Sequence, residues 1–269
     1  MTRIALVVSD VDGTLLTKDK VLTDKAARAV RQLEDSGVGF TVVSSRPTIG
    51  MKFLVEPLRL TLPFGSFNGS SITDPQLKPI EQHVLSASAA RRSLEILKQS
   101  GVDAWVFTSE KWFADNASGE YNPLEKRTIK ADPIIVDDFT AYLSAACKIV
   151  GSSSDPALLQ HCEAAMQQAV GAQATVACSQ TYYLDVTPPG YDKGTFVEAM
   201  MKRQGIAADA VATIGDMHND VAMFRKSGMS IAMGNATDEI KRQATNVTTS
   251  NQEEGFAGAI EIVMKRNKT

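Results

Sequence analysis

The sequence predicts an α/β protein with a doubly wound, Rossmann-like parallel sheet as its core and a second α/β domain inserted into that core. Short apolar runs rich in β-branched residues alternate with segments of helical spacing at both ends of the chain. This alternation is the pattern of βαβ units. The middle of the chain instead holds neighbouring strand-like runs, which indicates a separate insertion.

The first third of the chain predicts three strands of the core. Ile4 to Val8 is an apolar run, and residues 23–36 follow with apolar side chains at helical spacing. Residues 40–44 form the second apolar strand, and Pro47 begins another helix, because proline is favoured in a first helical turn. The third strand covers residues 63–67.

The last third repeats this alternation. Its expected elements are a helix over 194–204, a strand over 211–215, a helix over 219–227, a strand over 230–233 and a helix over 254–266. Such units imply a parallel sheet with helices on both faces.

The middle of the chain predicts an inserted α/β domain over residues 82–187, called the cap domain here, and the core then comprises 1–81 and 188–269. The expected cap elements are helices over 86–100 and 156–170 and strands over 104–108, 112–114, 147–150, 175–179 and 182–186. Proline and glycine at both crossing points suit a stiff linker with a pivot. The cap's aromatic residues are expected mainly in its own core: Trp105, Phe107, Trp112, Phe113, Tyr182 and Tyr183.

Composition excludes several classes of protein. The net charge is −3 with no long run of like charge, so the sequence shows no basic patch of the kind that binds nucleic acid or a membrane surface. Apolar runs are shorter than the roughly 18 residues of a membrane span, and the first is too short for a signal peptide. Cys147, Cys162 and Cys178 lack metal-ligand spacing and are expected to be reduced thiols of a cytoplasmic protein. Nothing in the sequence indicates an oligomeric state.

The first strand delivers Asp10 and Asp12 to a glycine turn at Gly13. Side chains two positions apart in an extended chain point the same way, so one carboxylate can attack while the other handles a proton. A calcium loop is excluded, because a strand precedes the motif and Val8 would stand at the first ligand position.

A second acidic loop, Gly215 to Asp220, follows a predicted strand. Asp216 and Asp220 are expected to join Asp10 around one hard cation at the carboxyl edge of the sheet, and oxygen-only ligands favour Mg²⁺. Helix capping is the alternative reading of this loop. His218 is expected to be an exposed loop residue.

Three further segments offer phosphate contacts. Lys193 begins a predicted helix, where the positive end of the helix dipole disfavours a lysine. An anion bound at the same place would remove this penalty, so Lys193 is a candidate phosphate ligand. The alternative is that Lys193 is an ordinary solvated surface lysine. Ser44 and Arg46 follow the second strand, where helix capping explains the serine equally well. Asn68 is the third candidate, but the pair Asn68-Gly69 is equally typical of a two-residue hairpin turn.

With these motifs in order, the chain resembles the haloacid dehalogenase superfamily, specifically its Cof-like phosphatases with a large class IIB α/β cap. The motifs are D-x-D-G-T-L at Asp10, a hydroxyl residue at Ser44, the pair Lys193-Gly194, and G-D-x-x-N-D at Gly215. One departure is visible: the second motif usually reads T-G-R, and here it is Ser44-Ser45-Arg46.

The resemblance implies a role for each matching residue. Asp10 would be the nucleophile and a Mg²⁺ ligand, and Asp12 the general acid and base that also gives its carbonyl to the metal. Asp216 would be the third ligand, while Asp220 would support the metal shell and orient Lys193. The substrate contacts would come from Ser44 and Lys193 on the phosphoryl group, Asn219 near it, and Arg46 and Asn68 on the substrate side.

These roles predict a Mg²⁺-dependent phosphatase that hydrolyses small phosphorylated metabolites, sugar phosphates first, through an aspartyl phosphate. A phosphomutase of the same superfamily is one alternative, with Arg91, Arg92 and Arg127 as the available cap arginines. A non-catalytic phosphate-binding protein on this fold is the other. The sequence leaves the particular substrate open.

Overall fold

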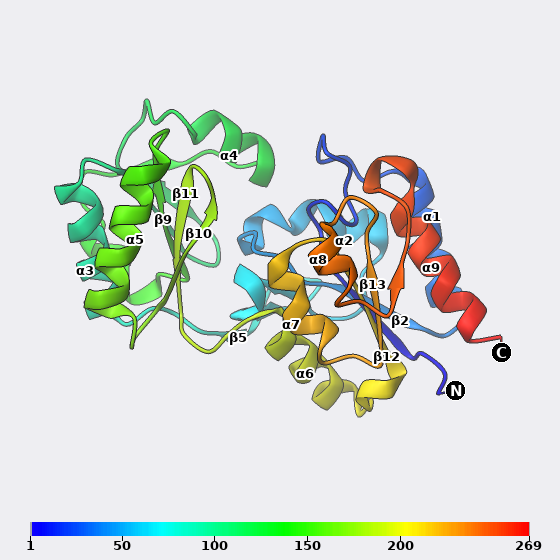
Figure 1. Ribbon diagram of the computed structural model, residues 1–269. Coiled ribbons are helices and arrows are strands. Elements are labelled where there is room, and N and C mark those ends of the chain that lie inside the picture. Colours follow the sequence, from blue (N-terminus) through cyan, green and yellow to red (C-terminus); the bar gives the residue numbers. More distant parts are fainter. Residues whose placement is uncertain (1, 269) are drawn as a thin grey trace. The chain divides into compact units, whose positions relative to one another are not determined.

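The structure is a computed structural model that describes residues 2–268. It divides into two compact units, each with its own sheet (Figure 1). Unit 1 comprises the residues up to Ser45, Lys52–Lys78 and the residues from Tyr191 onward, and unit 2 comprises Arg46–Met51 and Pro79–Gly190. Within residues 2–268, no helix combines the length and the apolar character that a membrane span requires.

Unit 1 is built on a five-stranded sheet with the strand order β14-β13-β12-β1-β2, and every neighbouring pair in it is parallel. The strands are β1 (Leu6–Ser9), β2 (Gly39–Val42), β12 (Val211–Gly215), β13 (Met229–Ala232) and β14 (Asn246–Val247). The predicted parallel sheet is confirmed. Because β1 lies between β2 and β12, segments from both ends of the chain meet at its centre.

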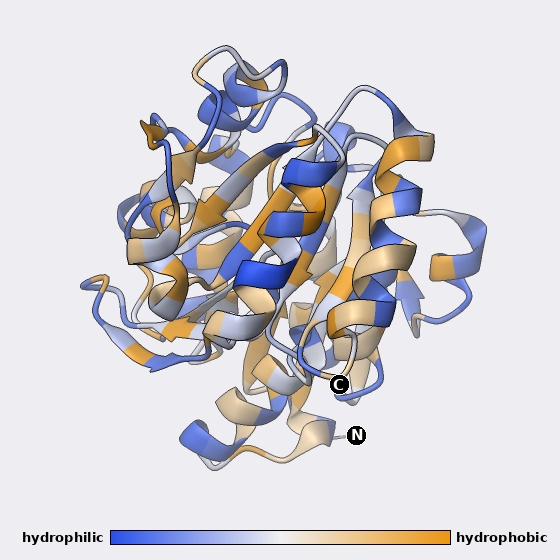
Figure 2. Ribbon diagram, turned by 90° about the vertical axis from the view of Figure 1, so that its left-hand side faces the viewer, coloured by the Kyte–Doolittle hydropathy of each residue, from blue (hydrophilic) through white to orange (hydrophobic). Residues whose placement is uncertain are grey.

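Helices cover both faces of this sheet, because successive side chains of its strands point to opposite faces. Phe40 packs edge-on against Phe256 of α9, with ring centroids 6.0 Å apart. Leu6 and Val8 belong to a buried cluster that contains Phe196 of α6. The helices of unit 1 are α1 (Asp24–Asp35), α2 (Lys52–Leu58), α6 (Lys193–Gln204), α7 (Val221–Phe224), α8 (Asp238–Lys241) and α9 (Gly255–Arg266). Figure 2 shows helices banded in hydrophilic and hydrophobic colours, as expected when one helical face is buried.

Two predicted helices begin differently from expectation. The helix expected from Pro47 starts as a 3₁₀ turn over Thr48–Gly50, and α2 follows it. The helix expected over 219–227 is a 3₁₀ turn over His218–Asp220 that leads into the short α7. Tight 3₁₀ turns are common at helix ends, where side chains also compete for backbone hydrogen bonds.

Unit 1 also contains an antiparallel hairpin of β3 (Phe64–Ser66) and β4 (Ser71–Thr73). A 3₁₀ turn over Phe67–Gly69 lies in the connection between them, so Asn68-Gly69 is not a two-residue hairpin turn. Asn68 has a φ of 57°, a left-handed conformation that asparagine tolerates better than most residues.

Unit 2 contains a six-stranded sheet with the order β10-β11-β9-β6-β7-β8. Its strands are β6 (Asp103–Phe107), β7 (Trp112–Ala114), β8 (Ile134–Ile135), β9 (Lys148–Ser152), β10 (Thr175–Gln180) and β11 (Tyr183–Thr187), and β5 (Pro79–Gln82) opens the unit. All pairs except β7 with β8 are antiparallel. The inserted α/β unit is confirmed. Its domain boundaries at 82 and 187 stay predictions, and the observed division falls at Pro79 and Gly190.

Two helices, α3 (Ala87–Gln99) and α5 (Pro156–Val170), pack on one face of the second sheet (Figure 1). Phe113 joins their apolar core, as expected for the aromatic residues of this unit. Trp105, Phe107 and Trp112 do not, because strand alternation places them on the opposite face. There they form a second aromatic cluster, in which Trp105 and Trp112 have ring centroids 5.2 Å apart.

A third helix of unit 2, α4 (Asn122–Ile129), is absent from the sequence prediction. The segment Arg46–Met51 belongs to the same unit. Arg46 is 4% exposed and donates hydrogen bonds to the carbonyl oxygens of Gly50 and Thr128, the latter in α4.

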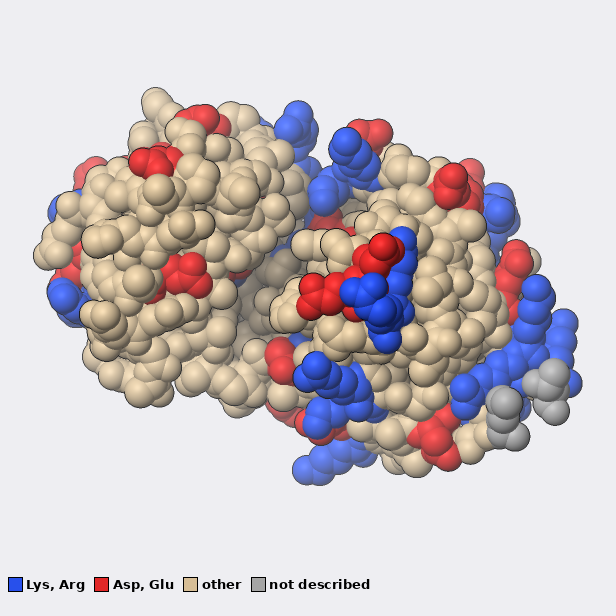
Figure 3. Space-filling model, viewed as in Figure 1, with Lys and Arg blue, Asp and Glu red and all other residues tan. Residues whose placement is uncertain are grey.

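Charges of both signs lie close together on the face of the molecule drawn in Figure 3. The three cysteines are free thiols, as expected. Burial raises the pKa of Cys147 to about 12, which keeps that thiol protonated and unreactive at neutral pH.

Candidate active site

Three loops that follow neighbouring strands of unit 1 form the candidate site. Asp10 directly follows β1, Ser44 lies just beyond β2, and Asp216 directly follows β12. The Asp10 N–H donates to the Ile214 carbonyl oxygen over 2.9 Å, so the sheet holds the backbone up to the carboxylate. Because the carboxyl ends of parallel strands meet at one edge of a sheet, residues from both ends of the sequence converge there.

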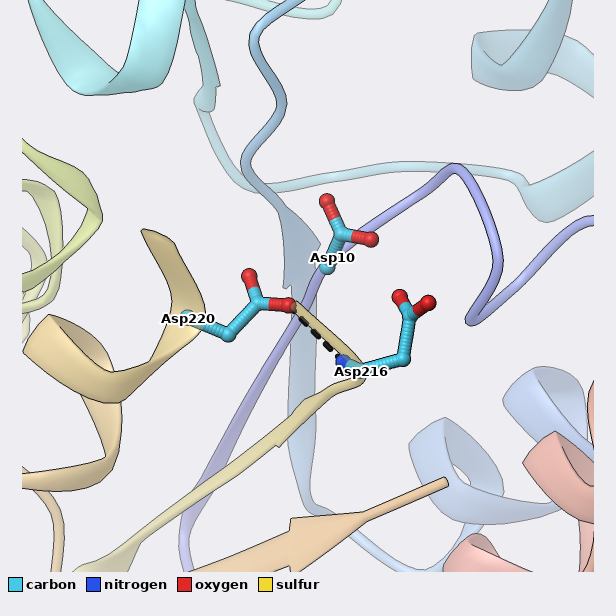
Figure 4. Close-up of side chains that lie close together, drawn as sticks. All are labelled: Asp10, Asp216 and Asp220. Carbon is cyan, nitrogen blue, oxygen red and sulfur yellow. Dashed lines mark hydrogen bonds between the residues drawn. The ribbon is translucent and has the colours of Figure 1, made fainter. Parts of the chain in front are cut away.

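Asp10, Asp216 and Asp220 form a compact acidic cluster (Figure 4). One carboxylate oxygen of each lies within 4.8 Å of the others, and the residues are 4%, 7% and 0% exposed. Buried carboxylates at this spacing repel one another unless positive charge offsets them. Their oxygen donors suit a hard divalent cation, so the residues present fit the predicted Mg²⁺.

Lys193, the first residue of α6, supplies positive charge to this cluster. Its Nζ donates to Asp10 Oδ1 and to Asp220 Oδ1, each over 2.6 Å, and its side chain is only 2% exposed. Lys193 is therefore not a solvated surface lysine. The helix begins here because the Asp192 side chain accepts the Thr195 N–H over 2.8 Å and caps its first turn.

The pKa values of the cluster are strongly perturbed. Burial raises the pKa of Asp10 well above its ordinary value, and Lys193 only partly opposes this effect. Burial and the neighbouring Asp220 raise the pKa of Asp216 to about 6. Burial alone would lower the pKa of Lys193, but Asp10 and Asp220 raise it above its ordinary value. Lys193 therefore stays charged at neutral pH, while Asp10 and Asp216 favour added positive charge nearby.

Asp220 connects the lysine to the second acidic loop. Its Oδ2 accepts the backbone N–H groups of Asp216 and Met217, each over 2.8 Å, while its Oδ1 accepts from Lys193. Figure 4 shows the first of these bonds as a dashed line. The side chain thus fixes the loop that presents Asp216. Its role as a direct metal ligand stays a prediction.

The Asp216 carboxylate is oriented by two residues that the sequence analysis did not assign to the site. Thr14 Oγ1 donates to its Oδ1 over 2.9 Å, and Asn235 Nδ2 donates to its Oδ2 over 3.1 Å. Gly13 permits this approach, since a Cβ built there would lie 2.4 Å from Asp216 Oδ2. Thr14 lies in the first motif and Asn235 in the Met233-Gly234-Asn235 stretch, so both lay within reach of motif reasoning.

Asp12 differs from the other acids because it is partly exposed. Its Oδ1 lies 2.7 Å from Lys20 Nζ, and the two side chains are 26% and 39% exposed. Lys20 has a φ of 60° and lies in a turn that is closed by backbone hydrogen bonds from Lys20 to Thr17 and from Thr17 to Val21. This partner of Asp12 was not predicted, because no periodic or motif signal marks it.

The predicted phosphate-side residues fall into two groups. The Ser44 carbonyl accepts the Asn68 N–H over 2.8 Å, and Asn68 Oδ1 accepts from Asn219 Nδ2 over 3.2 Å. Hydrogen bonds therefore connect these three residues. Arg46 belongs instead to unit 2. Their contacts with substrate stay predictions. His218 is exposed, as expected.

Comparisons with known proteins find relatives over most of the chain. The model of the haloacid dehalogenase-like hydrolases matches residues 7–260. A 5-amino-6-(5-phospho-D-ribitylamino)uracil phosphatase of Bacillus subtilis is 26% identical over 259 residues, covering 96% of this chain and 94% of its own length. Pyridoxal phosphate phosphatase of Escherichia coli is 23% identical over 264 residues, covering 94% and 96%.

A solved structure shows the same fold over nearly the whole chain. The crystal structure of a haloacid dehalogenase-like hydrolase from Bacteroides thetaiotaomicron has a TM-score of 0.91 and 25% identity, and the match covers 97% of this chain and 100% of that one. Matches of this extent include both units. The chain therefore belongs to the haloacid dehalogenase-like hydrolases.

Proposed function

We propose that this protein is a Mg²⁺-dependent phosphatase that hydrolyses small phosphorylated metabolites, sugar phosphates first, through an aspartyl phosphate on Asp10. The single observation that carries the proposal is the buried contact between Lys193 and Asp10 inside an acidic cluster that fits a divalent cation. Relatives that are phosphatases of phosphorylated ribitylaminouracil and of pyridoxal phosphate support the substrate class.

In the first half of the reaction, an Asp10 carboxylate oxygen attacks phosphorus. The bond between phosphorus and the leaving oxygen breaks, and Asp12 donates a proton to that oxygen, which departs as an alcohol. Splitting the displacement into two steps lowers the barrier of each. Lys193 keeps the attacking carboxylate oriented and stabilises the negative charge on the transferring phosphoryl group.

In the second half, Asp12, now ionised, accepts a proton from water. The water oxygen attacks phosphorus, the bond to Asp10 breaks, and inorganic phosphate leaves with Asp10 restored as a carboxylate. Asp12 thus acts as acid and then as base. Its partial exposure suits a group that must exchange protons with both alcohol and water.

Mg²⁺ held by Asp10 and Asp216, with Asp220 in support, would offset the repulsion between the anionic phosphate and the nucleophile. Thr14 and Asn235 hold the Asp216 carboxylate in place for this purpose.

The proposal is tested by phosphate release from hexose phosphates, polyol phosphates, pyridoxal phosphate and p-nitrophenyl phosphate, each with Mg²⁺ and with EDTA. We expect release that EDTA abolishes and Mg²⁺ restores. Transfer of phosphate to a second sugar hydroxyl without its release would identify a phosphomutase instead. Phosphate release that does not depend on Mg²⁺, or no phosphate release from any substrate, would contradict the proposal.

The catalytic roles are tested separately by Asp10→Asn and Asp12→Asn. Each variant should lose turnover of p-nitrophenyl phosphate while keeping the melting temperature within a few degrees of the parent, because asparagine has the same shape but neither attacks nor exchanges the proton. Near-parental hydrolysis by either variant would refute that residue's role.

A further inference from the structure

Unit 2 contains a cavity of about 270 Å³ on the face of its sheet that carries α3 and α5. The floor of this cavity is apolar and is formed by Leu94, Ala104, Phe139 and Leu143. Three of these residues are buried in the apolar core of the unit, and Leu94 packs against that core. Small-molecule sites begin at roughly 300 Å³, so the cavity suits a small ligand with an apolar part.

Two basic residues of α3 border this cavity. Arg91 and Lys98 lie seven positions apart, which is close to two turns of an α-helix, so they share one face of α3 with Leu94 between them. Both basic residues are exposed, and neither belongs to an ion pair within residues 2–268. Together they are the basic side of the cavity.

Two acidic residues border the cavity from a second segment. Asp137 and Asp138 lie just before the 3₁₀ turn Thr140–Ala145, and they are the acidic side of the cavity. Asp138 Oδ1 accepts the Thr140 hydroxyl over 2.8 Å and the Thr140 N–H over 3.1 Å, which orients this carboxylate. These hydrogen bonds, and more weakly the cations of the basic side, lower the pKa of Asp138, so this carboxylate is ionised at neutral pH.

The other two acids around the cavity already have partners. Asp115 Oδ1 accepts the Ala104 N–H over 3.0 Å, and Glu95 Oε2 forms an ion pair with Arg92 over 3.1 Å. Among the residues that the structure describes, no ion pair joins the basic side to the acidic side, although both border the same cavity. A ligand can therefore reach unlike charges there without breaking an existing ion pair.

The chemistry of the two sides defines the ligand. A carboxylate accepts charge-assisted hydrogen bonds from guanidinium and ammonium groups, and an ammonium group donates three hydrogen bonds to carboxylates. A ligand with only one of these charges would be attracted by one side and repelled by the other. A zwitterion satisfies both sides, and a short aliphatic body fits the apolar floor.

We propose that this cavity is a binding site for a small zwitterion, namely an α-amino acid with an aliphatic side chain. Its carboxylate contacts Arg91 and Lys98, and its ammonium group contacts Asp137 and Asp138. The site is separate from the acidic cluster at Asp10, because every residue that lines the cavity belongs to unit 2. It is a second function of the chain, beyond the proposed phosphatase activity.

Leucine is the probe for this site, and two molecules with the same branched body serve as comparators. 4-Methylpentanoate lacks only the ammonium group of leucine, and isoamylamine lacks only its carboxylate. Isothermal titration calorimetry on the full chain should show leucine binding at least about fivefold more tightly than either comparator, since a partly exposed ion pair contributes up to about fivefold. No binding of leucine, or equal binding of leucine and isoamylamine, would overturn the proposal.

Two double variants test the two sides separately. R91M/K98M should weaken leucine binding by about 5- to 25-fold and leave isoamylamine binding unchanged or tighter, because it removes only the basic side. D137N/D138N should weaken leucine binding to a similar extent and leave 4-methylpentanoate binding unchanged or tighter. Asparagine at position 138 still accepts the Thr140 hydrogen bonds, so this variant should keep the melting temperature of the parent within a few degrees.

The controls are R92M and D132N, which change exposed residues of unit 2 that do not line the cavity. Each should bind leucine as the parent does. Equal weakening of leucine binding by control and double variants, or equal weakening of all three probes by both double variants, would refute the site.

The binding measurements need neither substrate nor metal, so their result is independent of the proposed phosphatase activity. Adding inorganic phosphate with Mg²⁺ should not displace leucine, because the cavity and the acidic cluster at Asp10 are different sites. Displacement of leucine by phosphate with Mg²⁺ would place the probe at that cluster and overturn the proposal.

Discussion

Lys193 donates a hydrogen bond to Asp10 over 2.6 Å, although the lysine belongs to the first turn of α6, where a positive charge is unfavourable. The contact joins a residue near the start of the chain to one in its last third. The lysine's position is understandable only because carboxylates surround its ammonium group. The following predictions test this arrangement and the residues that support it.

Lys193→Met should reduce both activity and stability. It leaves Asp10 and Asp220 buried without their counter-charge, which we expect to lower the free energy of unfolding by about 3–5 kcal/mol in EDTA. Loss of its contact with the transferring group should lower kcat by about 100- to 1,000-fold. The control is Lys226→Met, which removes an exposed pair with Glu198 and should cost less than about 1 kcal/mol. Urea unfolding and phosphate release measure both effects. Equal destabilisation by the two variants would contradict the assignment.

Stability without metal should fall as pH rises across the titration of Asp216. Its pKa is raised from 3.8 to about 6, so the folded protein keeps a proton that the unfolded chain has already lost. Folding is therefore favoured below this window and loses that advantage as pH rises through it. The raised pKa of Asp10 acts in the same direction. Melting temperatures in EDTA should fall across the window, and Asp216→Asn should flatten the dependence.

Mg²⁺ should reverse this dependence, because it binds the ionised carboxylates of the folded state. The melting temperature should rise with Mg²⁺ above the window and respond little below it. A parent protein whose melting temperature is insensitive to Mg²⁺ at every pH would argue against a metal at this cluster.

Gly13→Ala should disrupt the position of Asp216. Gly13 has a φ of 81°, and its added Cβ would lie 2.4 Å from Asp216 Oδ2. Gly205→Ala separates the two causes, because Gly205 has a φ of 64° but its Cβ would meet nothing within 4 Å. The control should cost about 1–2 kcal/mol from backbone strain alone. Gly13→Ala should cost more and raise the Mg²⁺ concentration needed for half-maximal activity. Similar results for both variants would show that the close approach is unimportant.

Lys20→Met should impair the acid–base step without unfolding the protein. Lys20 is the ion-pair partner of Asp12, and both side chains are partly exposed, so the stability change should stay below about 1 kcal/mol. Without this partner the Asp12 carboxylate is less well oriented, and we expect kcat to fall about tenfold. Lys18→Met, at an exposed position in the same loop, is the control. An equal fall in kcat for Lys20→Met and Lys18→Met would contradict a role of Lys20 in orienting Asp12.

The acidic cluster was predictable because two general rules pointed to one place. Apolar strands identified β1 and β12, and the convergence of parallel strand ends placed Asp10 beside Asp216. Five strands of unit 2 were also predictable, since they keep regular apolar patterns, but the short parallel strand β8 was not. The partners that orient the acids were not. Thr14 and Asn235 lie in motif stretches, but nothing in those motifs says which carboxylate they contact, and no local signal at all marks Lys20 as the partner of Asp12.

The helix α4 shows the other limit of sequence reasoning. Its apolar side chains are few, with Leu124 and Ile129 five residues apart, so it has no helical apolar period. Its place is set by tertiary contacts, such as the hydrogen bond from Tyr183 to Glu125 over 3.5 Å. The hydrogen bond from Arg46 to the Thr128 carbonyl oxygen of α4 joins Arg46–Met51 to unit 2, although strand order suggests the core.

Asp220 ties the second acidic loop to the backbone of Asp216 and Met217 and to Lys193 with protein atoms only. These bonds would hold the loop that presents Asp216 in place whether or not the proposed cation is bound. Chelation should then be a rapid and fully reversible exchange, in which the ion departs and returns without rebuilding the loop.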